Sequence, residues 1–574
     1  MKQTKLIAYL LSLCLLLSLC ACGKKEKEEA PVEEDEVLSD TISGKKLTGG
    51  VAKDNVFSLA VDFDKSLNPL RTSSSASLSI AGLVFDNVFE VDANYNLSSR
   101  ICTDWRTNDE GNFWTLFIDT SIPMHDGSTL TAYDVAYSIQ RAMIYSSLYQ
   151  GRLYSVQGCS AYAEDQLCIS TKYPDTRLPW RLTIPVIKRG SILSNAPVGT
   201  GPYMFAYAEP EEPEPTPEPT PDAEEIDYGA APTPSPEPTP EPMPDRLVAF
   251  EQYGTGKGLP LDTIYLRKYT DPSSMITEYE SGLVDLVVND PTGMYNLGYG
   301  GMNEKRVFPT TNMHYLGFNG YSDFLCYSSY RQVLTHLIDR EAICSEVMDG
   351  WADAAAIPVN PRSELFDKEL SDSLSYDAEK CQEALAALGC RDLDDDGELE
   401  FSLSGSKVEI NLTFIVCSDT AAKVTSAKRI CEAMQEIGFP VTLKELPWKE
   451  YKYLLDNPQD EETKKASFDM YYDEVAITPD WDLMPFFEEK GPLNYGSWKV
   501  DSAVNAVTAY MSAGQGSQKE ACRTMCEALA QEALLIPVCF EKKVVISHLN
   551  VIRGMSPSQY NYFTNMQDWT INLP

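Results

Sequence analysis

The spacing of hydrophobic residues is most regular between residues 113 and 118. Trp114, Leu116 and Ile118 alternate with Phe113 and Phe117, so both faces of the segment carry large apolar side chains. A period of two is typical of a β-strand, and apolar side chains on both faces are typical of a strand covered on both sides. The pattern therefore predicts a strand at 113–118 with two buried faces.

A turn at Asp126-Gly127 and then a helix are predicted after this strand. Thr131 precedes Asp134 by three residues, which is the spacing of a capping box at the first turn of a helix. The apolar residues that continue the helical spacing are Val135, Ile139, Ala142 and Met143. Residues 113–143 thus predict a strand, a turn and an amphipathic helix.

Beyond residue 260, strand-like and helix-like patterns alternate, which predicts a mixed α/β fold. The predicted strands are 264–267, 284–288, 411–416 and 441–446. The predicted helices are 273–281, 331–348, 378–388, 425–437 and 517–533.

Residues 208–246 interrupt this pattern. They hold thirteen of the 36 prolines of the chain, and twelve acidic residues against one arginine. This composition is typical of a disordered, extended segment. The flanking segments 203–207 and 247–253 are strand-like, so we predict that the Pro/Glu-rich segment is an insertion at the tip of a β-hairpin within one domain. Loop closure tolerates such length because its entropic cost grows only logarithmically.

The first 21 residues predict a cleaved export signal. Lys2 and Lys5 precede an apolar run at 6–19, which is shorter than the ~20 residues that span a bilayer. Leu19-Cys20-Ala21-Cys22-Gly23 resembles a bacterial lipoprotein signal, which implies cleavage after Ala21 and a diacylglyceryl anchor, with palmitate, on Cys22. Ordinary secretion is the alternative. Residues 22–49 then form an acidic flexible tether, which places the protein at the extracytoplasmic face of the cell membrane.

Charge and length narrow the possible functions. The formal net charge is −38, from 85 acidic and 47 basic residues. Such a surface repels phosphate backbones, so we expect no binding to nucleic acid. A chain of 574 residues exceeds what one core usually supports, which favours two or more domains.

Residues that could carry out catalysis or bind a metal are scattered. No Cys-x-x-Cys pair occurs, so most of the twelve cysteines after Cys22 are expected to be buried small apolar residues. The four histidines share no short metal-ligand spacing and are His125, His314, His336 and His548. Gly199-Thr-Gly-Pro-Tyr203 lacks the ending of a phosphate-binding loop and predicts a tight turn. No catalytic site, metal or cofactor is predicted.

Asp392-Leu-Asp-Asp-Asp-Gly-Glu398 is similar to the first half of an EF-hand loop. Position 12 would be Leu403, so the bidentate carboxylate of a calcium loop is absent. We predict a polar turn here, and a calcium site is the alternative.

Several short segments, in this order and over roughly residues 50–574, resemble the extracellular solute-binding proteins, family 5, of peptide and nickel ABC importers. They are 67–70, 104–105, 123–142, 198–203, 280–285, 315–319, 331–334, 338–342, 376–379, 468–470 and 536–538. No single segment is decisive, but their order and spacing make chance agreement improbable.

The resemblance implies a two-lobed periplasmic-binding-protein-like α/β fold with mixed sheets, a hinge and an extra subdomain in the first lobe. The first lobe would comprise 50–305 together with 536–574, and residues 71–194 would be its subdomain. The second lobe would comprise 306–535. A chain that crosses between lobes twice would have its hinge at those crossings.

The resemblance also implies a ligand site between the lobes. Peptide-binding members place an aspartate against the amino terminus of the ligand, in a segment that matches Ala476–Pro485 here. The match departs from the family pattern because an upstream Trp is missing and the register of Asp480-Trp481-Asp482 is ambiguous. Asp480, Trp481, Asp482 and Asn319 are the expected ligand-binding residues. The alternative is that the two aspartates cap a helix at 483–488.

We therefore expect a monomeric, lipid-anchored binding protein that captures oligopeptides and delivers them to an ABC permease, and not an enzyme. The same fold holds nickel chelates, haem or oligosaccharides in other members of the family. The few histidines of this chain disfavour nickel, whereas its many Tyr and Trp residues leave a sugar open, because aromatic faces stack on a peptide or a sugar. A degenerate receptor is a further alternative. A cell-wall peptide hydrolase is disfavoured because nucleophile and metal motifs are missing.

Overall fold

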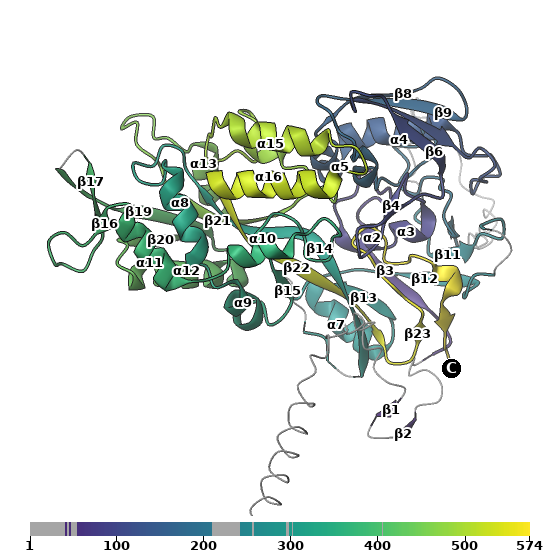
Figure 1. Ribbon diagram of the computed structural model, residues 1–574. Helices are drawn as coiled ribbons and strands as arrows, with labels where there is room; N and C mark the ends of the chain where they lie inside the picture. Colours follow the sequence, from purple (N-terminus) through teal and green to yellow (C-terminus); the bar gives the residue numbers. More distant parts are fainter. Residues whose placement is uncertain are drawn as a thin grey trace, which may run out of the picture. The chain divides into compact units, whose positions relative to one another are not determined.

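The computed structural model describes residues 41–42, 45–46, 54–208, 242–254, 258–293, 298–300, 302–403 and 406–574 (Figure 1). The predicted export signal, Cys22 and most of the tether lie outside the described residues, as does most of the Pro/Glu-rich insertion. Residues Met1–Leu47 and Thr48–Pro574 form separate units. Within the described part, no helix has the length and apolar character needed to cross a membrane.

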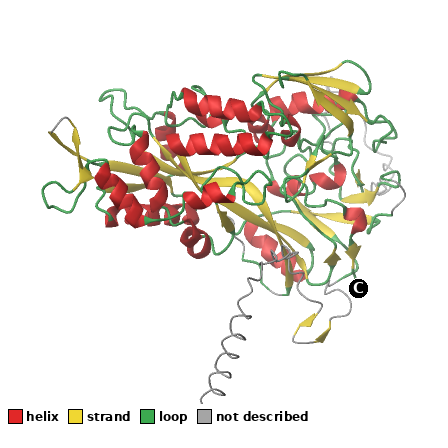
Figure 2. Ribbon diagram, viewed as in Figure 1, coloured by secondary structure: helices red, strands yellow, loops and turns green. Residues whose placement is uncertain are grey.

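Helices and strands alternate through the larger unit (Figure 2). A four-stranded sheet has the order β10-β11-β12-β3, and its strands are β10 (Tyr203–Ala206), β11 (Arg246–Ala249), β12 (Thr263–Lys268) and β3 (Ser58–Val61). β10 and β11 are antiparallel, with Ala206 opposite Arg246. The predicted hairpin at the ends of the insertion is therefore confirmed.

A second four-stranded sheet lies within the predicted subdomain. Its antiparallel order is β6 (Cys102–Thr107), β7 (Phe113–Ile118), β9 (Gln166–Thr171) and β8 (Val156–Ala161). Trp114, Leu116 and Ile118 of β7 are buried, but Phe113 is 45% exposed. The strand is therefore covered fully on one face only, and the prediction of two buried faces was wrong.

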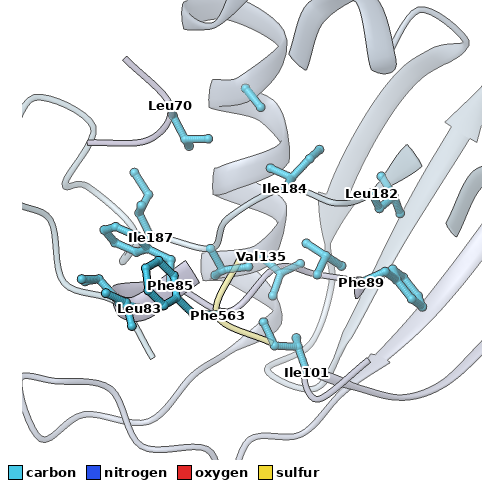
Figure 3. Packing of buried hydrophobic residues seen from close by; sticks show 14 of the residues in the cluster. Leu70, Leu83, Phe85, Phe89, Ile101, Val135, Leu182, Ile184, Ile187 and Phe563 are labelled. Carbon is cyan, nitrogen blue, oxygen red and sulfur yellow. The ribbon is translucent and has the colours of Figure 1, made fainter. Parts of the chain in front are cut away.

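Helix α4 (Ala132–Tyr145) forms where the capping-box spacing predicted it. The backbone N–H of Thr131 donates to the Asp134 carboxylate at 2.9 Å. Figure 3 shows Val135 of this helix among buried residues that include Phe85, Ile187 and Phe563. Phe563 lies near the C-terminus, so residues from near both ends of the chain pack into the same core.

The largest sheet joins segments that are far apart in the sequence. Its order is β13 (Leu286–Asn289), β22 (Leu535–His548), β14 (Asn303–Phe318), β21 (Met470–Ala476), β19 (Leu412–Cys417) and β20 (Val441–Leu446), and β15 (Ala352–Ala354) pairs with β22. β14 and β22 pair along most of their length, with register shifts between Pro309 and Met313 and between His314 and Tyr315.

Two lobes with separate cores are built around these long strands. One core combines residues from Phe57 to Phe308 with residues from Val545 to Trp569. A second combines residues from Leu316 to Cys539. A third lies mostly in the second lobe and also includes Val91 and Tyr95. The change from one core to the other falls inside β14 and β22, near the predicted lobe boundaries.

The remaining strands form short pairs or a small sheet. They are β1 (Thr41–Ile42), β2 (Lys45–Lys46), β4 (Glu90–Val91), β5 (Leu97–Ser98), β16 (Cys390–Arg391), β17 (Glu400–Leu403), β18 (Ser406–Glu409), β23 (Ile552–Arg553) and β24 (Thr570–Ile571).

The other helices connect or cover the sheets. They are α2 (Ser75–Ser79), α3 (Ala81–Val84), α5 (Ser147–Arg152), α6 (Leu178–Arg181), α7 (Pro272–Ser281), α8 (Ser328–Leu334), η1 (Thr335–Leu337), α9 (Arg340–Ala342), η2 (Ile343–Val347), α10 (Lys368–Ser373), α11 (Ala378–Ala387), α12 (Ala421–Glu436), α13 (Trp448–Asp456), α14 (Met484–Phe487), α15 (Asp501–Met511), α16 (Gln518–Glu532) and η3 (Met566–Asp568).

The single helix predicted at 331–348 is instead broken into short pieces. Ile338 has an extended backbone, and the carboxylate of Asp339 accepts a hydrogen bond from Ala342 N at 3.0 Å to begin a new helix. The apolar spacing of Leu334, Leu337 and Ile338 satisfied a helical pattern, but the capping aspartate decided the local structure.

Two further sequence predictions concern small residues. Ten of the twelve described cysteines are buried, and none of the twelve forms a disulfide, as expected for small apolar side chains. Gly199 and Gly201 lie in an irregular segment with a bend at 201–202, not in the predicted tight turn. Glycine is needed there because a Cβ at Gly199 would lie 2.1 Å from Val84 O. His125 Nε2 lies 2.9 Å from Gly201 O and joins this segment to residues 123–129.

Replacing residues 210–241 with a short Gly/Ser loop is expected to change the melting temperature by no more than about 2 °C. The pairing of β10 with β11 extends to Ala206 and Arg246 and does not involve residues 210–241. The length of the loop also affects its closure entropy only weakly. Thermal unfolding of the two chains, followed by circular dichroism, tests this. A loss of more than about 5 °C, equivalent to one or two kcal/mol in a domain of ordinary size, would show that the segment packs on the fold.

Candidate ligand site

Three of the four residues expected to bind ligand, Asp480, Trp481 and Asp482, lie in one short segment that follows β21. Trp481 has a φ of 60°, in the left-handed region, and its N–H donates to Thr478 O at 2.9 Å. Asp482 Oδ1 accepts a hydrogen bond from Met484 N at 2.9 Å, at the start of α14. The N-cap residue of α14 is Leu483, which makes no side-chain cap hydrogen bond. The alternative that both aspartates cap this helix is therefore not confirmed, because only Asp482 bonds to its first turn.

Arg181 joins both aspartates to the other lobe. Its Nε lies 2.7 Å from Asp480 Oδ2, and its Nη1 lies 2.9 Å from Asp482 Oδ2. Its Nη2 contacts Asp175, which also accepts a hydrogen bond from Ser155 Oγ at 2.9 Å. We refer to Arg181, Asp175, Asp480 and Asp482 as the interlobe ion cluster.

The interlobe ion cluster is fully buried and short of positive charge. Arg181 is 1% exposed, and Asp175 and Asp480 are 0% exposed. Three carboxylates surround one guanidinium, and Oδ1 of Asp480 and of Asp175 lack a hydrogen-bond partner within the described part of the chain. Burial raises the pKa of Asp175 to about 7, and Arg181 opposes this while Asp480 and Asp482 add to it. Burial likewise raises the pKa of Asp480.

Trp481 lies in an apolar contact between the lobes. Its side chain is 0% exposed, and its ring meets Tyr95 edge to face at a centroid distance of 5.0 Å. Its Nε1 donates to Ser363 Oγ at 3.2 Å. In this arrangement Trp481 packs the interface and presents no surface to solvent.

Asn319 lies apart from this cluster and has a structural environment. Its Nδ2 donates to Pro458 O and to Phe468 O, both at 2.7 Å, and its Oδ1 accepts from Tyr321 N at 3.0 Å. These bonds hold the turn after β14, so the polar atoms of Asn319 are used within the protein. The structure thus brings together Asp480, Trp481 and Asp482 but does not place Asn319 with them.

The sequence predictions did not include the partners that complete the cluster. Asp175 and Arg181 lie in Tyr173-Pro-Asp-Thr-Arg-Leu-Pro-Trp-Arg181, where charged residues alternate with apolar and proline residues. A charge inside an apolar segment is a signal of a buried ion pair. The second-lobe partner of Arg181 lies about 300 residues away in the chain, so no local sequence pattern identifies it.

A second buried ionic group was also missed by the sequence. His314 Nε2 lies 2.7 Å from Glu541 Oε1 and 3.2 Å from Glu474 Oε2, and Lys423 Nζ lies 3.2 Å from Glu474 Oε1. Burial lowers the pKa of His314, but hydrogen bonds and the charges of both glutamates outweigh it and raise the pKa to about 9. The three ligand atoms could hold a metal ion, and the nearby lysine opposes that use by repelling a cation.

The segment similar to an EF-hand has the features of the predicted polar turn. Asp392 accepts hydrogen bonds from Asp395 N at 2.7 Å and Gly397 N at 2.9 Å. Lys407 Nζ contacts Asp394 and lies 3.0 Å from Glu400. An ammonium group thus stands among the oxygens that a calcium ion would need.

The described residues form a two-lobed α/β fold with Asp480 and Asp482 at the contact between the lobes. A family model described as "Bacterial extracellular solute-binding proteins, family 5 Middle" matches residues 96–213 and 245–491. The chain belongs to this family of extracellular solute-binding proteins.

Individual relatives agree with this assignment. The oligopeptide-binding protein AppA of Bacillus subtilis is 23% identical over 473 residues, which is 78% of each chain. Its structure in complex with a nonapeptide has a TM-score of 0.58 at 17% identity, covering 91% of this chain and 99% of AppA. The structure of NikZ from Campylobacter jejuni in complex with Ni(L-His) has a TM-score of 0.60 at 17% identity, covering 90% and 99%.

The contribution of His314 to stability is expected to fall at alkaline pH. Its pKa is raised from 6.5 to about 9, so this contribution is complete below about pH 6.5 and is lost as the pH rises through 9. The full effect is on the order of 3 kcal/mol. Urea unfolding of wild type and His314→Gln between pH 6 and 10 measures the difference in unfolding free energy.

The half-buried His336, whose Nδ1 lies 2.8 Å from Ser375 O, provides the control variant His336→Gln. Comparison of the two variants separates the pairing of His314 with Glu474 and Glu541 from the loss of a histidine as such. A difference in unfolding free energy between wild type and His314→Gln that stays constant from pH 6 to 10 would contradict the pairing of a charged His314 with Glu474 and Glu541.

Proposed function

We propose that the protein is a lipid-anchored extracellular binding protein that captures oligopeptides between its two lobes and delivers them to an ABC permease. The observation that carries the proposal is the pair Asp480 and Asp482 at the contact between the lobes. Membership of the family and the relative that binds oligopeptides support the same conclusion.

The charge of the site suits the amino terminus of a peptide. Asp175, Asp480 and Asp482 outnumber the one guanidinium that pairs with them. Three of their buried oxygens have no hydrogen-bond partner in the described chain, and one of these, Asp480 Oδ2, lies beside Arg181 Nε. An ammonium group offers three donors and a positive charge, which are what such oxygens require. We propose that Asp480 and Asp482 pair with this group and that strand edges hold the peptide backbone.

Peptide binding can be tested with one nonapeptide in two forms, with a free and an acetylated amino terminus. The free form is expected to bind, and Asp480→Asn is expected to weaken it at least tenfold because a charge-assisted bond is lost. Isothermal titration calorimetry measures both. The control Asp372→Asn changes an exposed aspartate that pairs with Lys368.

Retention of no species from a mixed peptide library by native mass spectrometry would count against the proposed cargo. Binding of a nickel–histidine chelate in the same experiment would favour that solute instead.

The anchor is tested at the predicted lipid site. Cys22→Ser is expected to release the protein from the membrane fraction of a bacterial host, because one residue carries the lipid. Cys20→Ser is the matched control, since Cys20 leaves with the export signal and the variant should stay membrane-bound. Immunoblots of membrane and medium fractions measure the distribution. Membrane-bound Cys22→Ser would refute the anchor.

A further inference from the structure

Arg181 occupies the position that the proposed function gives to the positively charged end of the ligand. All three of its nitrogen atoms face carboxylates, and two of these carboxylates, on Asp480 and Asp482, come from the opposite lobe. No ligand is needed to make these contacts, because the guanidinium already supplies a positive charge and a planar set of donors.

Arg181 has a partner in its own lobe that keeps it in place when the lobes separate. Asp175 lies six residues before it and is held by Ser155 Oγ at 2.9 Å and by its own N–H, which donates to Gly111 O at 2.7 Å. Asp480 and Asp482 have no cation from their own lobe among the described ion pairs. Opening would therefore leave Arg181 paired and these two aspartates free for another cation.

The segment around Arg181 makes further directional contacts with the second lobe. Tyr173 OH donates to Asp482 Oδ2 at 2.7 Å, Thr176 N donates to Met511 O at 2.8 Å, and Arg177 Nη1 donates to Gln518 Oε1 at 2.9 Å. Residues 173–181 thus contact Asp482 and also helices α15 and α16 of the second lobe.

The contacts of Arg181 with the two aspartates are closed off from solvent. Arg181 is 1% exposed, and Asp480 and Trp481 are 0% exposed. A cation from solvent can reach Asp480 and Asp482 only if the lobes part at this contact, which also draws Arg181 away from them. A group attached to the same chain acts at an effective concentration on the order of millimolar, so it competes strongly with a ligand at micromolar concentration.

We infer that Arg181 is a built-in competitor for the ligand ammonium, which holds Asp480 and Asp482 in the ligand-free protein and lowers the affinity for peptides with a free amino terminus. The inference rests on the proposed function for its ligand, but its effect on closure does not. Arg181 is thereby a specificity-determining residue, because a ligand without a positive end gains nothing from displacing it.

Arg181→Gln in the full chain tests the inference in two independent ways. Without ligand, hydrogen–deuterium exchange of residues 173–181 and 476–484 is expected to rise at least tenfold, because the ionic contact between the lobes is lost. With ligand, the free-amine nonapeptide is expected to bind at least tenfold more tightly than to wild type, whereas the change for its acetylated form is smaller because that form has no ammonium to compete with Arg181.

Two further variants keep the test decisive. Arg106→Gln, which removes an exposed arginine that pairs with Asp104, is the matched control and should leave exchange and binding unchanged. Asp482→Asn removes one contact from the other lobe and should also raise ligand-free exchange, which tests the closure if Arg181→Gln does not fold.

The outcomes separate this inference from the proposed function. Wild-type exchange in Arg181→Gln, or weaker binding of the free-amine peptide to it, would overturn the role of Arg181 as a competitor. If no peptide binds to any variant, the proposed cargo fails, and faster exchange in Arg181→Gln would still support the closure by Arg181.

Discussion

The contact between the two lobes depends on the pairing of one guanidinium with three buried carboxylates. Removing water from Asp480 and Asp482 is unfavourable by several kcal/mol per ion unless a positive charge is close, and Arg181 is the residue that supplies it. The apolar contact of Tyr95 with Trp481 lies next to these charges, so packing of this loop and neutralisation of its carboxylates occur together.

A second buried ionic group lies on the long strands β14 and β22, where a different residue neutralises the carboxylates. The two strands run through both cores, and their register shifts lie beside His314. There the positive charge comes from a histidine whose partners, Glu474 and Glu541, lie on the two neighbouring strands. This cluster therefore lies within one continuous sheet, whereas the Arg181 cluster joins residues of the two lobes.

Local patterns were sufficient to predict much of the fold. The capping box of α4, the hairpin around the insertion and strand β20 follow from spacing and turn chemistry within a few residues. The errors arose where a distant or competing interaction decided the outcome, as at Asp339, which ended a helix that the apolar spacing favoured. For the site, the resemblance to a family placed Asp480 and Asp482 correctly at the contact between lobes, but Arg181 is joined to them only by tertiary folding. Asn319 was selected from a family segment, and its hydrogen bonds to Pro458 and Phe468 could not be read from that segment.

In a chain with a net charge of −38, acidic clusters alone say little about cation binding, since the chain can fill them with its own lysines and arginines. Lys407 does so among Asp394, Glu400 and Glu409 in a hairpin of one lobe, where no movement would free the carboxylates together. Arg181 does so across the boundary between the lobes, and it also pairs with Asp175 of its own lobe. The two cases differ in whether the cation and the carboxylates belong to the same lobe. A cation from the same hairpin forms a pair within one small sheet, whereas a cation from the opposite lobe forms the pair that, in our proposal, opening breaks and a ligand replaces.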